Sequence, residues 1–236
     1  MPWPVHRVNA DLVGTFMPKQ KGKLIMKLLP LAALVAAAML SALIVLDVVW
    51  NANNPGQPGP WLDAEGYPYL VPITGILHAA MYALLAAALI QSGRVIDGGR
   101  RFVRVLRWIL ISIFALFAGL FSVSTFDPSA ADTSGAYEIL ANVAFAVSLI
   151  TPIVLGFALI RRREFRVPAI LLIAPVVLLP LTFVLEAFTA FAHPGYIETA
   201  VNIGLALLCV AASLQPAASE PAQDAALLVT GQRSSL

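Results

Sequence analysis

Polar side chains inside otherwise apolar stretches are the residues of this sequence that could do chemistry. The ionisable ones are Asp47, His78, Glu138, Glu186, His193 and Glu198, and two amides accompany them, Asn142 and Asn202. An ionisable side chain inside a bilayer is costly unless it faces the protein interior or water, so it marks a candidate functional site. Such a set could bind a cation, a proton or a small polar ligand.

Two pairs of these residues have the same spacing. Glu138 precedes Asn142 by four residues, and Glu198 precedes Asn202 by four, so each pair shares a helix face. A glycine three residues before each glutamate completes the pattern G-x-x-E-x-x-x-N, which suggests related helical hairpins. A structural interpretation stays open, because the helix dipole stabilises a carboxylate in a first turn and an asparagine can link two helices.

Glu186 and His78 are predicted to be the deepest ionisable groups. Glu186 lies about five residues, or roughly 7.5 Å, inside its apolar segment, and His78 about eight residues, or roughly 12 Å. Helical spacing places Glu186 on one stripe with Thr182, Thr189 and His193. We therefore expect Glu186 and His78 to be the inner ligands of a pocket.

A metal site is an alternative use of the same residues. His78, Glu186 and His193, joined by Glu138 or Glu198, would suit a divalent cation such as zinc if their helices converged. The single cysteine, Cys209, excludes a disulfide within the chain and a thiolate zinc cluster. No Walker A loop, H-E-x-x-H or G-x-S-x-G motif occurs, which favours a protein that is not an enzyme.

The elements that must position these residues are membrane-spanning helices. Hydrophobic residues make up 59% of the 236, charged residues only 12%, and the mean hydropathy is +0.84. Soluble domains carry about 25% charged residues, so a soluble enzyme, a disordered chain and a nucleic-acid-binding domain are excluded. A spanning helix needs about 20 apolar residues. Six segments qualify: 28–50, 70–90, 108–126, 138–160, 167–191 and 197–214.

These segments predict an all-α, polytopic membrane protein, a six-helix bundle over residues 28–214. The repeated motif favours a bundle of three related helical hairpins. Residues 1–27 and 215–236 are predicted to be disordered tails. With six spans, all 15 lysines and arginines fall on one side of the membrane. The positive-inside rule then predicts that both termini lie in the cytoplasm. The expected location is the plasma membrane.

Basic and small residues predict partners within the membrane. The segment from Arg100 to Arg107 interleaves arginines with apolar residues and suits anionic lipid headgroups, at about 1 kcal/mol per basic residue. Small residues recur at helical spacing on the third span, where they favour close packing with other helices. They are Ser112, Ala115, Gly119 and Ser122.

Three short motifs carry a family resemblance. They are Phe126-Asp127-Pro128, Arg161-Arg162-Arg163 and Gly195-Tyr196-Ile197-Glu198. With six spans, they make residues 108–214 resemble the bacterial membrane family called domain of unknown function 998. The resemblance implies a bacterial source, a six-helix bundle and no established activity.

Three functions are consistent with the sequence. The first is an outward-facing polar pocket that binds a cation, a proton or a small polar ligand for transport or sensing. The second is a non-catalytic membrane scaffold or accessory subunit that holds partner helices through its small-residue faces. The third is a metal-dependent intramembrane enzyme that acts on lipid.

Overall fold

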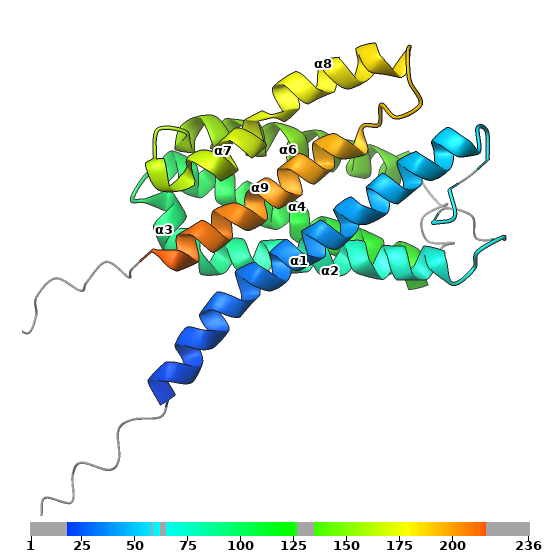
Figure 1. Ribbon diagram of the computed structural model, residues 1–236. Coiled ribbons are helices and arrows are strands. Elements are labelled where there is room, and N and C mark those ends of the chain that lie inside the picture. The colour runs from blue at the N-terminus through cyan, green and yellow to red at the C-terminus, as the bar shows by residue number, and fades with distance from the viewer. Residues whose placement is uncertain (1–17, 58, 62–64, 127–134, 216–236) are drawn as a thin grey trace, which may run out of the picture.

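The computed structural model describes residues 18–57, 59–61, 65–126 and 135–215, which contain helices and no strand (Figure 1). The long helices are α1 (Pro18–Asn53), α2 (Leu70–Gln91), α4 (Arg101–Phe126), α6 (Gly135–Leu159) and α9 (Gly195–Leu214). The shorter elements are α3 (Gly93–Asp97), the 3-10 turn η2 (Arg163–Phe165), α7 (Arg166–Ile173) and α8 (Pro175–Glu186).

Within these residues, six helical stretches of 20 to 26 residues are long and apolar enough to cross a membrane. This finding confirms the predicted all-α, six-helix membrane protein. The first apolar stretch begins at Leu28 as predicted, although α1 itself begins at Pro18, and α4 begins at Arg101 rather than at 108. Because arginine and leucine are good helix formers, the basic segment predicted as a loop forms the first turns of α4. The rest of the two predicted tails, residues 1–17 and 216–236, lies outside the described residues.

The fifth span is interrupted at Ala174, between α7 and α8. Proline at position 175 has no amide hydrogen for a helical hydrogen bond and crowds the preceding turn, so it bends a helix. Figure 1 shows the consequence: α7 lies along α6 and α9, while α8 diverges from them. The interruption therefore leaves α8 loosely packed.

The central helix of the bundle is α9. Half of its membrane-spanning stretch is buried, against 22–33% for the other five. It packs against α1, α2 and α7. Two glycines allow α7 to approach closely: a Cβ atom at Gly156 of α6 would meet the Ala169 backbone, and one at Gly204 of α9 would meet Leu172.

A buried ion pair joins the helices at one end of the bundle. Arg107 of α4 donates from Nε and Nη2 to the two carboxylate oxygens of Asp97, at 2.9 and 3.0 Å, and from Nη1 to the Leu89 carbonyl at 3.3 Å. Arg104 donates a further bond to Asp97 at 3.3 Å. Asp97 is 3% exposed and Arg107 6%. The guanidinium of Arg107 thus ties α2, α3 and α4 together, and it is not available to a lipid headgroup.

We predict that Asp97→Ala lowers the free energy of unfolding by about 3 kcal/mol, because it leaves the buried Arg107 without a counterion. Denaturant unfolding of the purified protein in mixed micelles would measure the loss. Glu164→Ala is the matched control, since it removes the more exposed pair with Arg162, and it should cost far less because solvent screens that pair. Equal losses for the two variants would contradict the structural role of the Asp97 pair.

Candidate functional site

A carboxylate in the interior of the bundle is the centre of the candidate site. The Tyr82 hydroxyl donates a hydrogen bond of 2.7 Å to Oε1 of Glu198. The Asn202 side chain donates a second, of 3.4 Å, to the same oxygen. Tyr82 is 6% exposed and Asn202 4%. Both donors therefore converge on Oε1, and no described residue donates to Oε2 of Glu198.

The helices position these groups through packing and periodicity. Glu198 and Asn202 lie one turn apart at the start of α9, as their four-residue spacing predicts. Tyr82 extends from α2, and its ring contacts three aromatic rings of α4, with centroids 5.1–5.8 Å apart. Those rings are Phe114, Phe117 and Phe121. The aromatic contacts fix the Tyr82 ring and so aim its hydroxyl at the carboxylate.

His78 lies beside this cluster without bonding to the carboxylate. Its ring stacks on Phe121 with centroids 4.7 Å apart. Its Nδ1 is 2.8 Å from the Thr74 carbonyl, which can only accept, so Nδ1 carries the proton of that bond. His78 and Tyr82, one turn apart on α2, thus both contact aromatic rings of α4, but only Tyr82 bonds to Glu198.

Glu198 lies well inside the bundle along its long axis, although it is in the first turn of α9. Two contacts fix the register of α9 against α2: Tyr82 with Glu198, and the Ser92 hydroxyl with the Cys209 carbonyl at 3.5 Å. Tyr82 is about 12 residues, or roughly 18 Å, from the start of its helix. Because the hydrocarbon layer is about 30 Å thick, this level is near its middle. The start of α9 therefore lies well below the start of α2.

A cavity of about 200 Å³ borders the carboxylate. It lies between α4, α6, α8 and α9, and its walls are apolar apart from Tyr82, Ser148, Glu198 and Asn202. Phe145 of α6 and Phe183 of α8 line it and are 57% and 67% exposed. An exposed face on a membrane-spanning helix is a lipid-facing one. The cavity, named here the Glu198 cavity, thus borders the bilayer between α6 and α8.

Glu186 is not deep in the bundle, contrary to the sequence prediction. It is the last residue of α8 and is exposed. The predicted helix to residue 191 is wrong beyond this point, because the amides of Phe188 and Thr189 both donate to the Leu185 carbonyl and the chain turns. The stripe from Thr182 to His193 is therefore not one helix face.

The remaining predicted residues lie apart from the cavity. His193 accepts a hydrogen bond of 3.1 Å from the Gly195 amide, next to the start of α9. Asn142 is exposed on α6. The side chain of Glu138 lies outside the described residues. Asp47 is hydrogen-bonded at 3.3 Å to Asn51, on the same helix.

The residues considered for a metal site are not gathered into one. Among the residues described, no group of three His, Cys, Asp or Glu side chains is placed to hold a metal ion. Glu198 has Tyr82 and Asn202 as neighbours, which are a hydroxyl and an amide rather than strong metal ligands.

Two groups of structural importance were not identified from the sequence. One is Tyr82: a hydroxyl in an apolar span needs a hydrogen-bond partner, and that need is the signal by which it could be found. Asp97 is the acid within an otherwise basic segment, and that isolation was the signal that an arginine would pair with it.

The chain matches no protein-family model, no curated protein and no solved structure. The resemblance to domain of unknown function 998 therefore stays a prediction.

We predict that Tyr82→Phe lowers the free energy of unfolding by about 1–3 kcal/mol, because it removes a buried donor to the half-buried Glu198 carboxylate. Unfolding in mixed micelles would measure the change. Tyr69→Phe is the matched control, since Tyr69 is 82% exposed, and it should leave the free energy within about 0.5 kcal/mol of the wild type. If the two variants behaved alike, the Tyr82 hydroxyl would not be part of a stabilising network.

Proposed function

We propose that this multi-pass membrane protein binds a small amphiphile from the bilayer in the Glu198 cavity, for transport or sensing. The observation that carries the proposal is the free carboxylate oxygen. Tyr82 and Asn202 both donate to Oε1 of Glu198, and Oε2 has no donor among the described residues. The carboxylate is therefore held in place by one oxygen and can receive a ligand at the other.

The chemistry of the walls favours a ligand with a cationic or hydrogen-bond-donating head. No lysine, arginine or histidine among the described residues forms an ion pair with Glu198. Glu198 is half-buried, and a carboxylate partly removed from water without a counterion is unfavourable, so an ammonium group is a stabilising partner for it. The rings of Phe114, Phe145 and Phe183 line the same cavity and can contact a cation through their faces.

The size of the cavity limits how much of the ligand is enclosed. Apolar cavities of about 150 Å³ accept a molecule such as benzene, and the Glu198 cavity is about 200 Å³. A polar head and a few carbon atoms fit within it. The rest of an alkyl chain would extend between α6 and α8 into the bilayer, where Leu149 and Leu179 line the way.

The packing of α8 supports the entry of a ligand from the side. This helix follows the interruption at Ala174, contains Pro180 and diverges from the bundle in Figure 1. A small displacement of α8 would widen the cavity, and it would break few contacts because α8 packs only loosely on α6, α7 and α9. Lateral entry also requires no aqueous path, in keeping with the apolar walls.

A scaffold function is supported by one separate observation. Ser112, Ala115 and Gly119 form an exposed small-residue face on α4, and a Cβ atom at Gly119 would meet nothing within 4 Å. Such faces allow two membrane helices to approach closely. The metal-dependent enzyme has no comparable support within the described residues.

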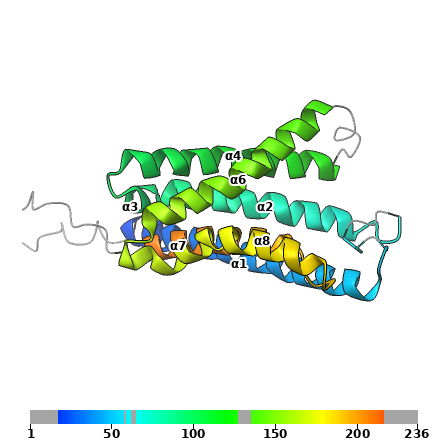
Figure 2. The same cartoon turned by 90° about the horizontal axis from the view of Figure 1, so that it is seen from above.

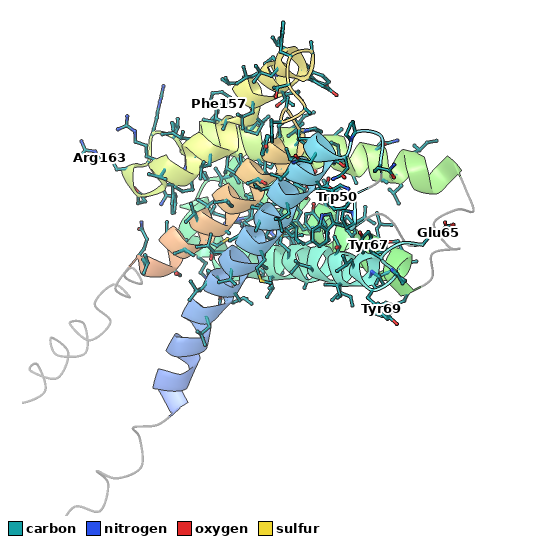
Figure 3. All side chains as sticks on the ribbon, turned by 45° about the vertical axis from the view of Figure 1, so that its right-hand side comes forward. Trp50, Glu65, Tyr67, Tyr69, Phe157 and Arg163 are labelled. Carbon is teal, nitrogen blue, oxygen red and sulfur yellow. The ribbon has the colours of Figure 1, made fainter. Side chains whose placement is uncertain are left out.

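We infer that the basic end of the bundle faces the cytoplasm of a bacterial cell. Arg163 lies at one end of the molecule and Glu65, Tyr67 and Tyr69 at the other in Figure 3, and α3 and α7 lie at the same end in Figure 2. The positive-inside rule assigns arginine-rich ends to the cytoplasm. The plasma membrane is the proposed location.

Accessibility of single cysteines tests this orientation. In a Cys209→Ser background, Gln57→Cys should react with a membrane-impermeant maleimide in intact cells, because the positive-inside rule places it outside. Arg163→Cys should react only after the cells are permeabilised. Both positions are exposed, so access to solvent is not the difference between them. The reverse labelling pattern would overturn the orientation.

Binding of a fluorinated octylamine tests the proposed function. Fluorine NMR of the protein in lipid nanodiscs should show saturable binding by the wild type. Glu198→Gln should weaken it about tenfold or more, because a charged hydrogen bond contributes about 1.5–3 kcal/mol. Glu186→Gln is the matched control and should bind as the wild type does, since Glu186 is exposed and does not line the cavity.

Fluorinated octanoate and octanol complete the experiment. The carboxylate of octanoate should be rejected by Glu198, and octanol should bind more weakly than the amine. Equal binding of all three molecules, or equal effects of the two glutamine variants, would show that Glu198 does not select the ligand. The scaffold alternative would then be the better-supported function.

A further inference from the structure

Two adjoining hollows lie at the basic end of α4, far from the Glu198 cavity. The first, named here the head hollow, has a volume of about 360 Å³ and lies between α2, α3 and the first turns of α4. The second, named the tail groove, has a volume of about 430 Å³ and is lined by α4 alone. Arg104 and Trp108 line both, so the two hollows form one continuous surface.

The head hollow carries a net positive charge. Three guanidinium groups line it, those of Arg94, Arg104 and Arg107, against the single carboxylate of Asp97. Arg107 neutralises Asp97 through two hydrogen bonds. The side chain of Arg94 is exposed and forms no hydrogen bond or ion pair with a described residue. The side chain of Arg104, 56% exposed, bonds only through Nε. The free donors of Arg94 and Arg104 therefore suit a phosphate group.

The tail groove is apolar and follows α4 away from these charges. Val105, Ile109 and Ile113 line it together with Ser112. From Arg104 to Ser112 the helix rises by roughly 12 Å. Trp108 lies between the charged and the apolar parts and is 50% exposed, as is typical of tryptophan at a membrane interface. Along α4 the charged residues come first, then the tryptophan, then the apolar surface. This is the order of the headgroup, the glycerol backbone and the acyl chain in a phospholipid.

We propose that the head hollow and the tail groove together bind one anionic phospholipid. Arg94 and Arg104 contact its phosphate, Trp108 packs at the level of its glycerol backbone, and an acyl chain lies along Val105 and Ile109. The site goes beyond the proposed function of the Glu198 cavity, because it binds an anionic headgroup at the basic end of the bundle rather than a cationic one in the cavity. The sequence predicted that the whole Arg100–Arg107 segment contacts lipid, and the proposed site uses only part of it. Arg107 is bonded to Asp97, and Arg100 donates to the Ala158 carbonyl.

Quenching of Trp108 fluorescence tests the proposal. The full chain is placed in nanodiscs of phosphatidylcholine that contain increasing fractions of brominated phosphatidylglycerol. Subtracting the quenching of Trp108→Phe from that of the wild type isolates the signal of this site from the other tryptophans. Half-maximal quenching should occur at a lower fraction of phosphatidylglycerol than of brominated phosphatidylcholine.

Arginine variants identify the residues that bind the lipid. Arg94→Gln and Arg104→Gln should each raise the half-quenching fraction of phosphatidylglycerol roughly fivefold, the effect of one basic residue near an anionic surface. Arg101→Gln is the matched control, because Arg101 is exposed on the same helix but lines neither hollow. It should leave the half-quenching fraction unchanged. Quenching by phosphatidylcholine should be the same in every variant if the fold is intact.

Three outcomes would overturn the proposal. Equal quenching by the two lipids would show that the site does not select charge. An equal effect of Arg101→Gln would show general attraction to the surface rather than binding. Displacement of phosphatidylglycerol by inorganic phosphate alone at millimolar concentration would show an anion site in which the tail groove has no function.

Discussion

The constraint on which this structure depends is that backbone amides and carbonyls within a bilayer must bond to each other, because no water is present to replace them. The chain therefore crosses the membrane only as helix, and it can change direction only where a residue disrupts the helical hydrogen bonds. Pro175 is such a residue in the fifth span. The interruption turns α8 away from α6 and α9, and the space that remains between them is the Glu198 cavity.

The same lack of water determines where charges are found. Asp97 and Arg107 are buried together, so neither is left without a partner. Glu198 has no such cation among the described residues, and its desolvation is offset only through one oxygen, by Tyr82 and Asn202. Two hydrogen bonds to one oxygen reduce the cost of placing this carboxylate in a membrane-spanning helix. A cationic ligand at the other oxygen would stabilise it further. Asp97, which is paired with an arginine, is therefore interpreted as structural, and Glu198, which has no cation beside it, as the candidate binding residue.

The sequence was sufficient to predict the six spans, because each requires about 20 apolar residues and nothing distant. It also predicted that Glu198 and Asn202 share a face, since helical periodicity is local. It failed on position within the bundle: Glu186, predicted as an inner ligand, is exposed at the end of α8, and Glu198 lines the cavity instead. The position of Glu198 along the bundle depends on where α9 starts relative to α2. That register is set by contacts between the two helices, which the sequence does not show. The Asp97–Arg107 pair was missed because a turn at Gly98, with a left-handed φ of 51°, brings together residues without helical spacing.

The two proposed binding sites differ in how they can respond to a ligand. The phospholipid site is built on the start of α4, which packs along α2 and is clamped there by Arg107. Binding at that site can strengthen an arrangement that already exists, but it cannot easily move the helix. The Glu198 cavity has α8 as one wall, and this helix is separated from α7 by the interruption at Ala174. Because a ligand shifts a structure only through an element with a second accessible position, α8 is the element through which occupancy of the cavity would become a signal or a transport step.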